Sequence, residues 1–308
     1  MKNQQPSNHN LILPVGTQVV TRVAVKLVDG LERSCGALGV IIKALDQAHS
    51  YLVQFPDDTK VSLRREELSI HKQWQAKNWQ PTTNSDQSYL YNYVIYRCIV
   101  GSKAYSLDDE NSDTDRRGIY LPPAELHWSL SNIPEQLDNK ATEECYWEMQ
   151  KFLTLALKAN PNVLECLFTP LIETLTPLAE ELLAMRQLFL SKLVYQTYNG
   201  YVMSQFKKLE QDLRTKGVIK PKHAMHLIRL LLSGITVLRE GIVTVRVDEN
   251  KDKLLLIRHG EMPWQEVNSW RLSLHQEFEK AFNQTTLPEP PDYQQVNDFL
   301  IKARRSMV

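Results

Sequence analysis

The first 75 residues alternate between short apolar runs and turn residues. Four runs rich in β-branched and aromatic side chains cover residues 19–25, 40–44, 51–55 and 59–63, and glycines or a Pro-Asp-Asp turn separate them. Runs of this length, bounded by Gly, Pro and Asp, are typical of β-strands. Because such short strands must hide their open edges, we expect them to curl into a small barrel.

The pattern changes after residue 88, where strands come first and helices follow. Apolar and aromatic runs predict strands over residues 91–100, 113–121 and 143–149. From Lys151 onward the apolar residues return every three or four positions, which predicts helices. The first two helices are interrupted at Asn160-Pro161, and the later ones cover residues 177–189, 192–213, 223–238, 264–282 and 293–305, with a short β insert at 242–247 and 253–257.

Together these patterns predict an α+β protein in four segments. Residues 1–75 form the small barrel and residues 76–88, which are polar and contain a proline, form a linker. Residues 89–170 form a core built on a mixed sheet, and residues 171–308 form a mostly helical domain. The order of Gly, Val and aromatic positions in the first segment resembles that of SH3-like and KOW-like barrels, a kind of domain that binds RNA or proteins.

Composition and charge exclude several classes of protein. Lys and Arg number 36 and Asp and Glu number 36, so nucleic acid cannot be held by bulk positive charge alone. No run approaches the roughly 20 apolar residues of a membrane span, and the first ten residues lack a secretory signal. The four cysteines are scattered, which favours free thiols over a zinc site or a disulfide frame. We therefore expect a cytoplasmic protein with no membrane contact.

The segment with the most chemical information follows the strand predicted at 91–100. Gly101-Ser102 ends that strand, and because glycine has no Cβ its backbone N–H groups can approach a phosphate closely. Asp113 and Asp115 follow two residues apart, so on a strand they would share one face. Two carboxylates on one face suit Mg²⁺, which prefers oxygen ligands. The alternative is that both belong to a solvated acidic loop, because Asp108 and its neighbours are acidic too.

This combination resembles the DNA polymerase β nucleotidyltransferase superfamily, in which a strand, Gly-Gly or Gly-Ser, and Asp-x-Asp follow one another. The closer resemblance is to a group of predicted nucleotidyltransferases associated with RNA repair, and it continues in order through residues 91–305. The positions that match its main motif are Gly101, Ser102, Ala104, Tyr105, Ser112, Asp113, Asp115, Arg117 and Gly118. Ser106 departs from the pattern, since the family usually has glycine there.

The resemblance also implies a third carboxylate on a neighbouring strand. Its position falls on Glu143, with Glu144 and Glu148 as nearby alternatives. An aspartate is usual at this position, so glutamate is a departure. By resemblance, Asp113, Asp115 and Glu143 would hold two Mg²⁺ or Mn²⁺ ions, and Gly101 and Ser102 would hold the phosphates of a nucleoside triphosphate.

The helical region supplies positive charge. Seven Lys or Arg residues lie between Lys207 and Arg229, against two acidic residues. Ser204 and Lys208 are four residues apart and share a helix face, and by resemblance this pair would contact the triphosphate. The excess could face a triphosphate or an RNA backbone, but Lys207, Arg214 and Lys216 are expected to form only a solvated helix face.

By resemblance, Lys222, His223 and His226 would belong to a phosphate or acceptor site. His223 and His226 lie one turn apart, a spacing that fits a metal site. The same spacing also fits hydrogen-bonded packing, and both interpretations stay open at this point.

Two functional hypotheses follow. The first is a metal-dependent transferase that moves a nucleoside monophosphate from an NTP to a hydroxyl, with an RNA end as the leading acceptor. The second is an RNA- or protein-binding module whose transferase core is weak or inactive, and the substituted third acid is the main point in its favour. A P-loop NTPase is excluded because G-x-x-x-x-G-K-[ST] is absent from the sequence.

Overall fold

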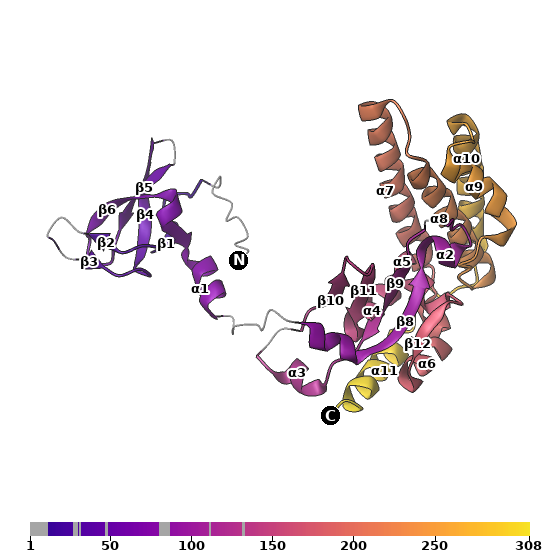
Figure 1. Cartoon of the computed structure of the whole chain (residues 1–308), viewed down its shortest axis with the longest axis horizontal. Helices are drawn as coiled ribbons and strands as arrows, with labels where there is room; N and C mark the ends of the chain where they lie inside the picture. Colours follow the sequence, from indigo (N-terminus) through magenta and orange to yellow (C-terminus); the bar gives the residue numbers. More distant parts are fainter. Residues whose placement is uncertain are drawn as a thin grey trace. The chain divides into compact units, whose positions relative to one another are not determined.

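The computed structural model describes residues 12–26, 30, 32–46, 49–79, 87–110, 112–130 and 133–308, apart from the side chains of residues 76–79 and 216. The chain divides into two compact units, residues 1–85 and 86–308. Figure 1 labels the elements of both units.

The N-terminal unit is built mainly from antiparallel strands. Its larger sheet has the order β6-β5-β4-β1-β7 and a smaller one pairs β2 with β3. Along β5 the side chains of Tyr51 and Val53 are buried and those between them are not, as expected for a sheet with one covered face. The strands are β1 (Gln18–Thr21), β2 (Val25–Lys26), β3 (Glu32–Arg33), β4 (Leu38–Leu45), β5 (Ser50–Gln54), β6 (Lys60–Arg64) and β7 (Leu68–Ile70), with the turn η2 (Arg65–Glu67) before the last.

The boundary of this unit differs in one respect from the sequence-based expectation. Helix α1 (His71–Trp79) extends through residues 76–79, which were expected to begin the linker. Its Gln, Lys and Ala residues are good helix formers, which explains why a polar stretch is helical here. Residues 80–86 of the predicted linker lie outside the described residues. Closure of the strands into a barrel stays a prediction.

The C-terminal unit contains a mixed five-stranded sheet of order β10-β11-β9-β8-β12. The central strands β8 (Val94–Val100), β9 (Asp115–Tyr120) and β11 (Glu144–Glu148) confirm three predicted strands. The outer strands β10 (Gln136–Asn139) and β12 (Ile172–Leu175) were not predicted, because they are short and largely polar or exposed. Strands β9 and β11 run parallel and the other pairs are antiparallel.

The sheet has one face against the main core and another against a small cluster. Tyr96, Cys98 and Ile119 belong to the core shared with the helices. Tyr120 and Tyr146 pack on the other face with Leu90 of η3 (Ser88–Tyr93). Alternate residues of one strand therefore serve different faces, and this alternation decides which side chains can meet at the site.

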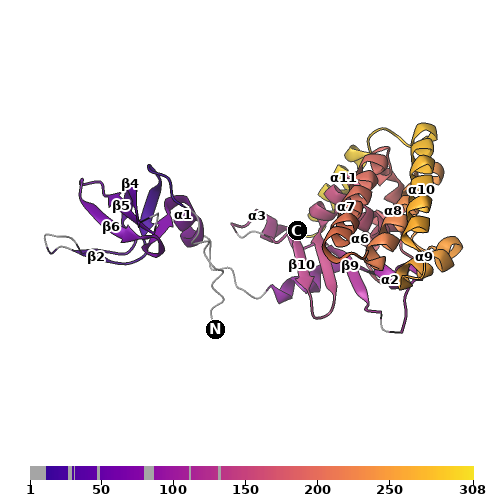
Figure 2. The ribbon, with the colours of Figure 1, turned by 90° about the horizontal axis from the view of Figure 1, so that it is seen from above.

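Most helices lie on one side of this sheet, as Figure 2 shows. Asn160 caps α5 through its side chain, and Pro161 occupies the first turn, so the predicted interruption is confirmed. None of the described helices is both long and apolar enough to cross a bilayer. The helices are α2 (Gly101–Tyr105), α3 (Ala124–Trp128), α4 (Met149–Leu157), α5 (Pro161–Phe168), α6 (Pro177–Ala184), α7 (Leu193–Lys216), α8 (Pro221–Glu240), α9 (Lys251–His259), α10 (Trp264–Gln284) and α11 (Tyr293–Arg305), with the 3₁₀ turns η4 (Arg186–Phe189) and η5 (Asp248–Asn250).

The predicted β insert is wrong. Residues 242–247 form no strand, and residues 253–257 belong to α9. The apolar run in this segment is short enough to fit either structure. Leu254 and Ile257 are three residues apart and both buried, which is the spacing of one helix face.

Candidate active site

The site begins where β8 turns into α2, at the end of the sheet where β9 starts (Figure 1). Gly101 has φ +73°, a conformation that side chains disfavour. A Cβ on this residue would lie 2.5 Å from Oδ2 of Asp115. Val100 and Asp115 are register partners across β8 and β9. The glycine thus allows the backbone of the turn to lie directly against the Asp115 carboxylate.

Asp113 and Asp115 do not share a strand, which corrects the basis for placing them on one face. Strand β9 begins at Asp115, and Asp113 lies in the loop before it. The Asp115 carboxylate is about one-third exposed and lies 3.4 Å from Nη2 of Arg117. Asp113 is exposed, and its carboxylate has no hydrogen-bond or ion-pair partner among the described residues. Neither side chain is committed to the fold by several strong contacts.

The loop before Asp113 is held from two sides. Lys103 Nζ of α2 donates a hydrogen bond to Oγ1 of Thr114, the residue between the two aspartates. Arg258 of α9 donates to Asp109 Oδ2 at 2.7 Å and to Ser112 Oγ at 3.3 Å. Arg258 was not predicted from the sequence, because a strand over 253–257 gave no reason to place this residue near the loop.

Ser106 explains why the family usually has glycine after the Ala-Tyr pair. It ends α2 with φ +61° and ψ +31°, in the left-handed region that glycine adopts most easily. The serine keeps the required backbone conformation at some cost in free energy, so the departure from the family pattern leaves the turn intact.

Of the three candidate third acids, Glu143 is the one whose position in the strand register falls opposite Asp115, one residue before the Glu144–Arg116 pair. In the parallel pair, Glu144 is the register partner of Arg116, so its side chain shares the face of Arg116 and Tyr146. Tyr146 has a pKa raised to about 12, mainly by burial, and the charge of Glu144 contributes to that rise. Glu143 stands one residue before the strand with φ +52°, and its carbonyl accepts a hydrogen bond from the Arg116 N–H at 3.0 Å.

Cys145 occupies the next β11 position on the Asp115 face, as the register partner of Arg117. Burial is the main reason that its pKa is raised to about 12. Cys145 and Trp147, the β11 residues whose register partners are Arg117 and Ile119, carry no carboxylate, so this face of β11 itself offers none beside Asp115.

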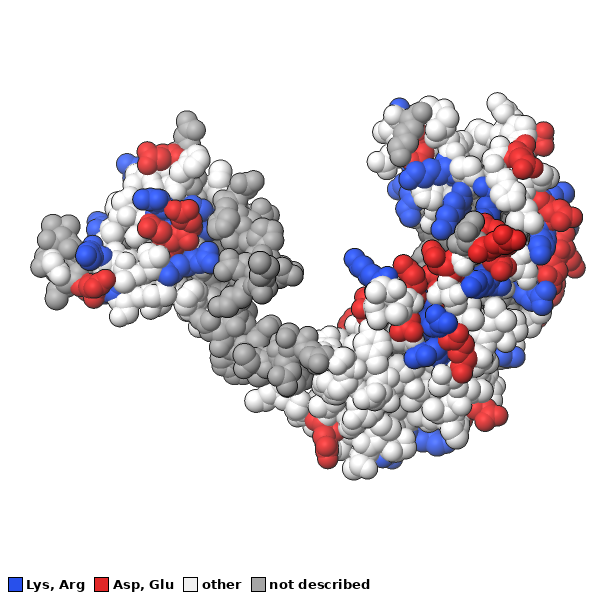
Figure 3. All heavy atoms as spheres, viewed as in Figure 1, with Lys and Arg blue, Asp and Glu red and all other residues white. Residues whose placement is uncertain are grey.

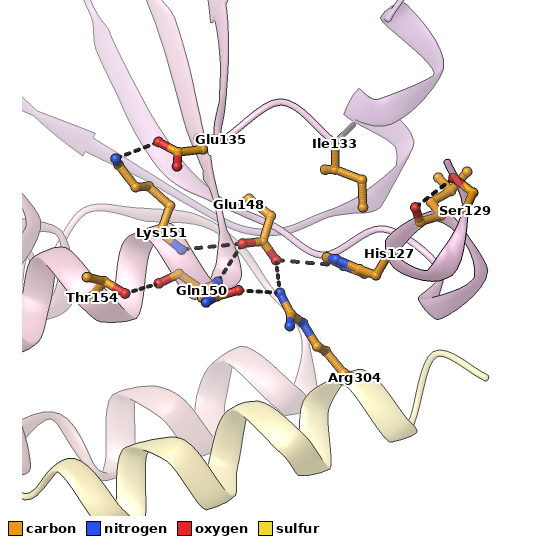
Figure 4. Close-up of a pocket in the computed structure, with 10 residues that line it drawn as sticks. His127, Ser129, Ile133, Glu135, Glu148, Gln150, Lys151, Thr154 and Arg304 are labelled. Atoms are coloured by element: carbon orange, nitrogen blue, oxygen red, sulfur yellow. Dashed lines mark hydrogen bonds and ion pairs between the residues drawn. The ribbon is translucent and has the colours of Figure 1, made fainter. Parts of the chain in front are cut away.

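Glu148 lies at the other end of β11 and is fully committed to structural contacts, which Figure 4 shows. Its carboxylate caps α4 by accepting from the backbone N–H of Gln150 at 2.8 Å and of Lys151 at 3.3 Å. Arg304 Nη2 donates to it at 3.2 Å, and His127 Nε2 lies 3.7 Å away. The carboxylate lines a polar pocket of about 390 Å³ at the opposite end of the sheet from Asp115.

A buried polar network connects α2 with the helical region. The Tyr105 hydroxyl donates to Glu165 Oε2 at 2.6 Å, and Arg229 Nη1 donates to Oε1 of the same carboxylate. The Arg229 guanidinium also lies over the Tyr105 ring, 3.8 Å from its centroid. Burial is the largest reason that the pKa of Tyr105 is raised. Tyr105, Glu165 and Arg229 therefore connect α2, α5 and α8.

The site residues predicted on α7 and α8 divide into two groups. Ser204, Lys208 and Lys222 are exposed and have no hydrogen-bond or ion-pair partner among the described residues. His223 instead directs Nδ1 at Asp212 Oδ2, 3.1 Å away, and joins α8 to α7. Figure 3 shows Lys and Arg side chains gathered along α7 on this face of the C-terminal unit.

The donor set fits a divalent metal in part. Asp113 and Asp115 provide accessible carboxylate oxygens next to a glycine backbone. Within the described ranges, no group of three or more His, Cys, Asp or Glu side chains is arranged to hold a metal ion. Mg²⁺ commonly completes its coordination with substrate phosphates and water, so the two aspartates are suitable but incomplete by themselves.

The fold and this site define the class. A mixed sheet carries a Gly-Ser turn against an aspartate at one end, as in polymerase β-like nucleotidyltransferases. Residues 72–302 match the model of the RlaP family, described as the RNA repair pathway DNA polymerase beta family, and the chain belongs to that family. It is also 32% identical over 82 residues to "Uncharacterized protein YcgL" of Bacillus subtilis (strain 168), a match that covers 26% of this chain and 32% of that protein.

Proposed function

We propose that this protein is a metal-dependent nucleotidyltransferase that transfers a nucleoside monophosphate from an NTP to a hydroxyl acceptor. The observation that carries the proposal is the contact between the Gly101 turn and the Asp115 carboxylate. This contact supports the proposal because backbone N–H groups of such a turn suit a phosphate and the neighbouring carboxylate suits a cation. Family membership supports the same class.

Each residue of the site has a role in this proposal. Gly101 and Ser102 bind the β- and γ-phosphates, and Lys208 and Lys222 offset their charge. Asp113 and Asp115 hold Mg²⁺ or Mn²⁺, two ions if Glu143 contributes. When bound, the metal offsets the charge that develops on the triphosphate and lowers the pKa of the acceptor hydroxyl.

An RNA hydroxyl is the proposed acceptor. The description of the family refers to an RNA repair pathway, and the lysines on α7 and α8 can contact a phosphate backbone. The second candidate function, a binding module with a weak or inactive core, is favoured by the lack of a third acid placed to complete the metal site among the described residues.

Transfer from labelled NTPs onto RNA distinguishes the two functions. The full chain is incubated with each α-³²P-labelled NTP, Mg²⁺ or Mn²⁺ and total RNA, alongside the Asp113→Asn and Asp115→Asn variants. We expect each variant to lose transfer by about 10³-fold, because charge stabilisation by such groups contributes on that order. Asp252→Asn, an exposed aspartate of α9, is the matched control and should retain full activity.

Wild-type labelling that both site variants lose, and the control keeps, supports the transferase. If the wild type neither labels any RNA nor binds an NTP in a Mg²⁺-dependent way, the binding module becomes the better description. Full activity in either site variant would contradict the assignment of the metal-binding aspartates.

A further inference from the structure

The buried ion pair between Glu165 and Arg229 is not explained by its contribution to the stability of the fold. Both side chains are at most 3% exposed. A buried ion pair rarely stabilises a protein more than an apolar pair of similar volume, because both charges lose their hydration. Such a pair is better explained by what it orients. On one side it holds Tyr105, the last residue of α2.

On the other side the pair fixes His226, one turn earlier on α8. Arg229 Nη2 lies 3.2 Å from His226 Nδ1. A guanidinium can only donate, so Nδ1 must be the acceptor and the proton of the neutral ring must be on Nε2. The pKa of His226 is lowered to about 3, first by burial and then by the charges of Arg229, Lys208, His223 and Lys222. The ring is therefore neutral at physiological pH, with its hydrogen on a defined atom.

No described residue accepts a hydrogen bond from the Nε2–H of His226. The contact with Arg229 is the one hydrogen bond of His226 within the described part of the chain, and Nε2 is not among the buried polar atoms without a partner. The charges of Lys208 and Lys222 act on this ring, and neither lysine has a carboxylate partner among the described residues. A neutral ring N–H on a defined atom, with two lysines near enough to lower the pKa of the ring, suits a phosphate oxygen.

We propose that His226 binds a phosphate oxygen of the nucleoside triphosphate, and that Arg229 and Glu165 are positioning residues that hold His226 and α2 in one arrangement. This inference rests on the proposed nucleotidyltransferase function. The ion pair transmits the arrangement because Tyr105 and His226 both contact it, one from α2 and the other from α8. Phosphate bound by His226 would thus sit in a fixed place relative to the Gly101 turn.

The binding test uses the full chain and two probes, inorganic triphosphate with Mg²⁺ and a short RNA oligonucleotide. His226→Leu removes the donor, whereas His226→Gln can place an amide N–H near the position of Nε2. We expect His226→Leu to weaken triphosphate binding by about 10-fold or more, since hydrogen bonds to charged groups contribute on this scale, and His226→Gln to recover most of it. His71→Leu, in the N-terminal unit, is the control and should bind normally.

The positioning role is tested by Arg229→Lys, which keeps the charge but loses the Nη2 contact with His226. In ¹⁵N NMR spectra the imidazole should lose its single tautomer in this variant, and triphosphate binding should weaken. In the His226→Leu background the same change should add little, because the two residues act through one contact. Tyr105→Phe keeps the ion pair and the fold, and should leave the His226 tautomer unchanged while reducing the rate of transfer.

The outcomes separate the two proposals. Unchanged triphosphate binding in His226→Leu, or additive losses in the double variant, would overturn the role of His226 while leaving the transferase intact. A loss confined to the RNA probe would overturn the assignment of the phosphate to the nucleotide. A wild-type protein that neither binds triphosphate nor transfers a label would count against the proposed function itself.

Discussion

The two ends of the parallel pair β9–β11 both carry carboxylates, but in opposite circumstances. At one end Asp115 begins β9 and Glu143 stands just before β11, and both are accessible to solvent. At the other end Glu148 is buried and is contacted by two backbone N–H groups, Arg304 and His127. Carboxylates at one end of the pair are therefore available to a ligand, whereas the carboxylate at the other end is engaged in contacts that hold the fold.

The difference lies in the number of partners. The Asp115 carboxylate has one arginine at 3.4 Å, and Asp113 has no partner among the described residues. Oxygens without strong protein contacts are available to a cation, whereas those of Glu148 are already occupied. Counting acids in a sequence cannot make this distinction, because it depends on what surrounds each carboxylate.

The substitution with the largest expected effect fills the space beside Asp115. In Gly101→Ala, the new Cβ would lie 2.5 Å from Oδ2 in a backbone conformation that alanine disfavours. We expect transfer to fall by about 10²-fold, since small displacements of a catalytic group have effects of that order, and the free energy of unfolding to fall by about 1–3 kcal/mol. Initial rates and urea denaturation measure both. Gly200→Ala, where a Cβ meets nothing within 4 Å, is the control.

The next test compares substitutions of glutamates at the two ends of the strand pair. Glu148→Ala removes the α4 cap and leaves Arg304 with fewer acceptors, so the free energy of unfolding should fall by about 2 kcal/mol. Activity per folded molecule should be unchanged. Glu143→Ala should have the opposite pair of effects, with normal stability and with transfer reduced by about 10-fold or more, because loss of even an outer-shell partner of a metal ligand typically costs about 10–100-fold.

Equal effects of these two substitutions on transfer would remove the contrast between the ends. If Glu143→Ala has no effect while Glu144→Ala reduces transfer, the third acid is Glu144 and the opposite face of β11 takes part. Thermal melting of each variant separates lost folding from lost chemistry.

A smaller effect is expected on how the free energy of unfolding depends on pH below neutrality. In the folded protein the pKa of His226 is about 3, against 6.5 for an ordinary histidine. Between these values the unfolded chain binds a proton that the folded chain does not, so the free energy of unfolding decreases as pH falls below about 6.5. One such group contributes up to about 1.4 kcal/mol per pH unit. Denaturant unfolding at pH 7, 6 and 5 should show a weaker dependence in His226→Gln, and an unchanged slope would contradict this account.

The smallest expected effect is at Ser106. Glycine adopts its left-handed conformation without strain, so Ser106→Gly should raise the free energy of unfolding by about 0.5–1 kcal/mol. Transfer should stay near the wild-type rate, because the turn keeps its shape. A lower melting temperature in this variant would show that the serine side chain contributes to stability in a way its backbone does not indicate.

The sequence predicted the elements that long patterns define. Helix α11 lies where its spacing indicated, and the central strands of the mixed sheet were found within a few residues. The edge strands and the helix containing Leu254 were missed, because short segments have no unambiguous period. Glu148 was a candidate ligand in the sequence, and only its tertiary contacts show that it is a structural residue.

The candidate site could be predicted to the extent that its residues are neighbours in the chain. Gly101, Ser102, Asp113 and Asp115 lie within fifteen positions of one another, so a local motif identifies them. The Arg258 contact and the Glu165–Arg229 pair join segments 149 and 64 residues apart. No spacing rule connects such residues, because their proximity results from the packing of whole helices.

The contact of Arg258 with the loop before Asp113 has a consequence for synthesis. Arg258 follows Asp109 by 149 residues, so the arginine is synthesised after the loop that it contacts. At roughly 5–20 residues per second, a ribosome needs about 7–30 s to add the intervening chain. During that time the emerging polypeptide has its acidic loop but not the helix that secures it. The end of the sheet that holds Asp113 and Asp115 is therefore completed late, after most of the chain has been synthesised.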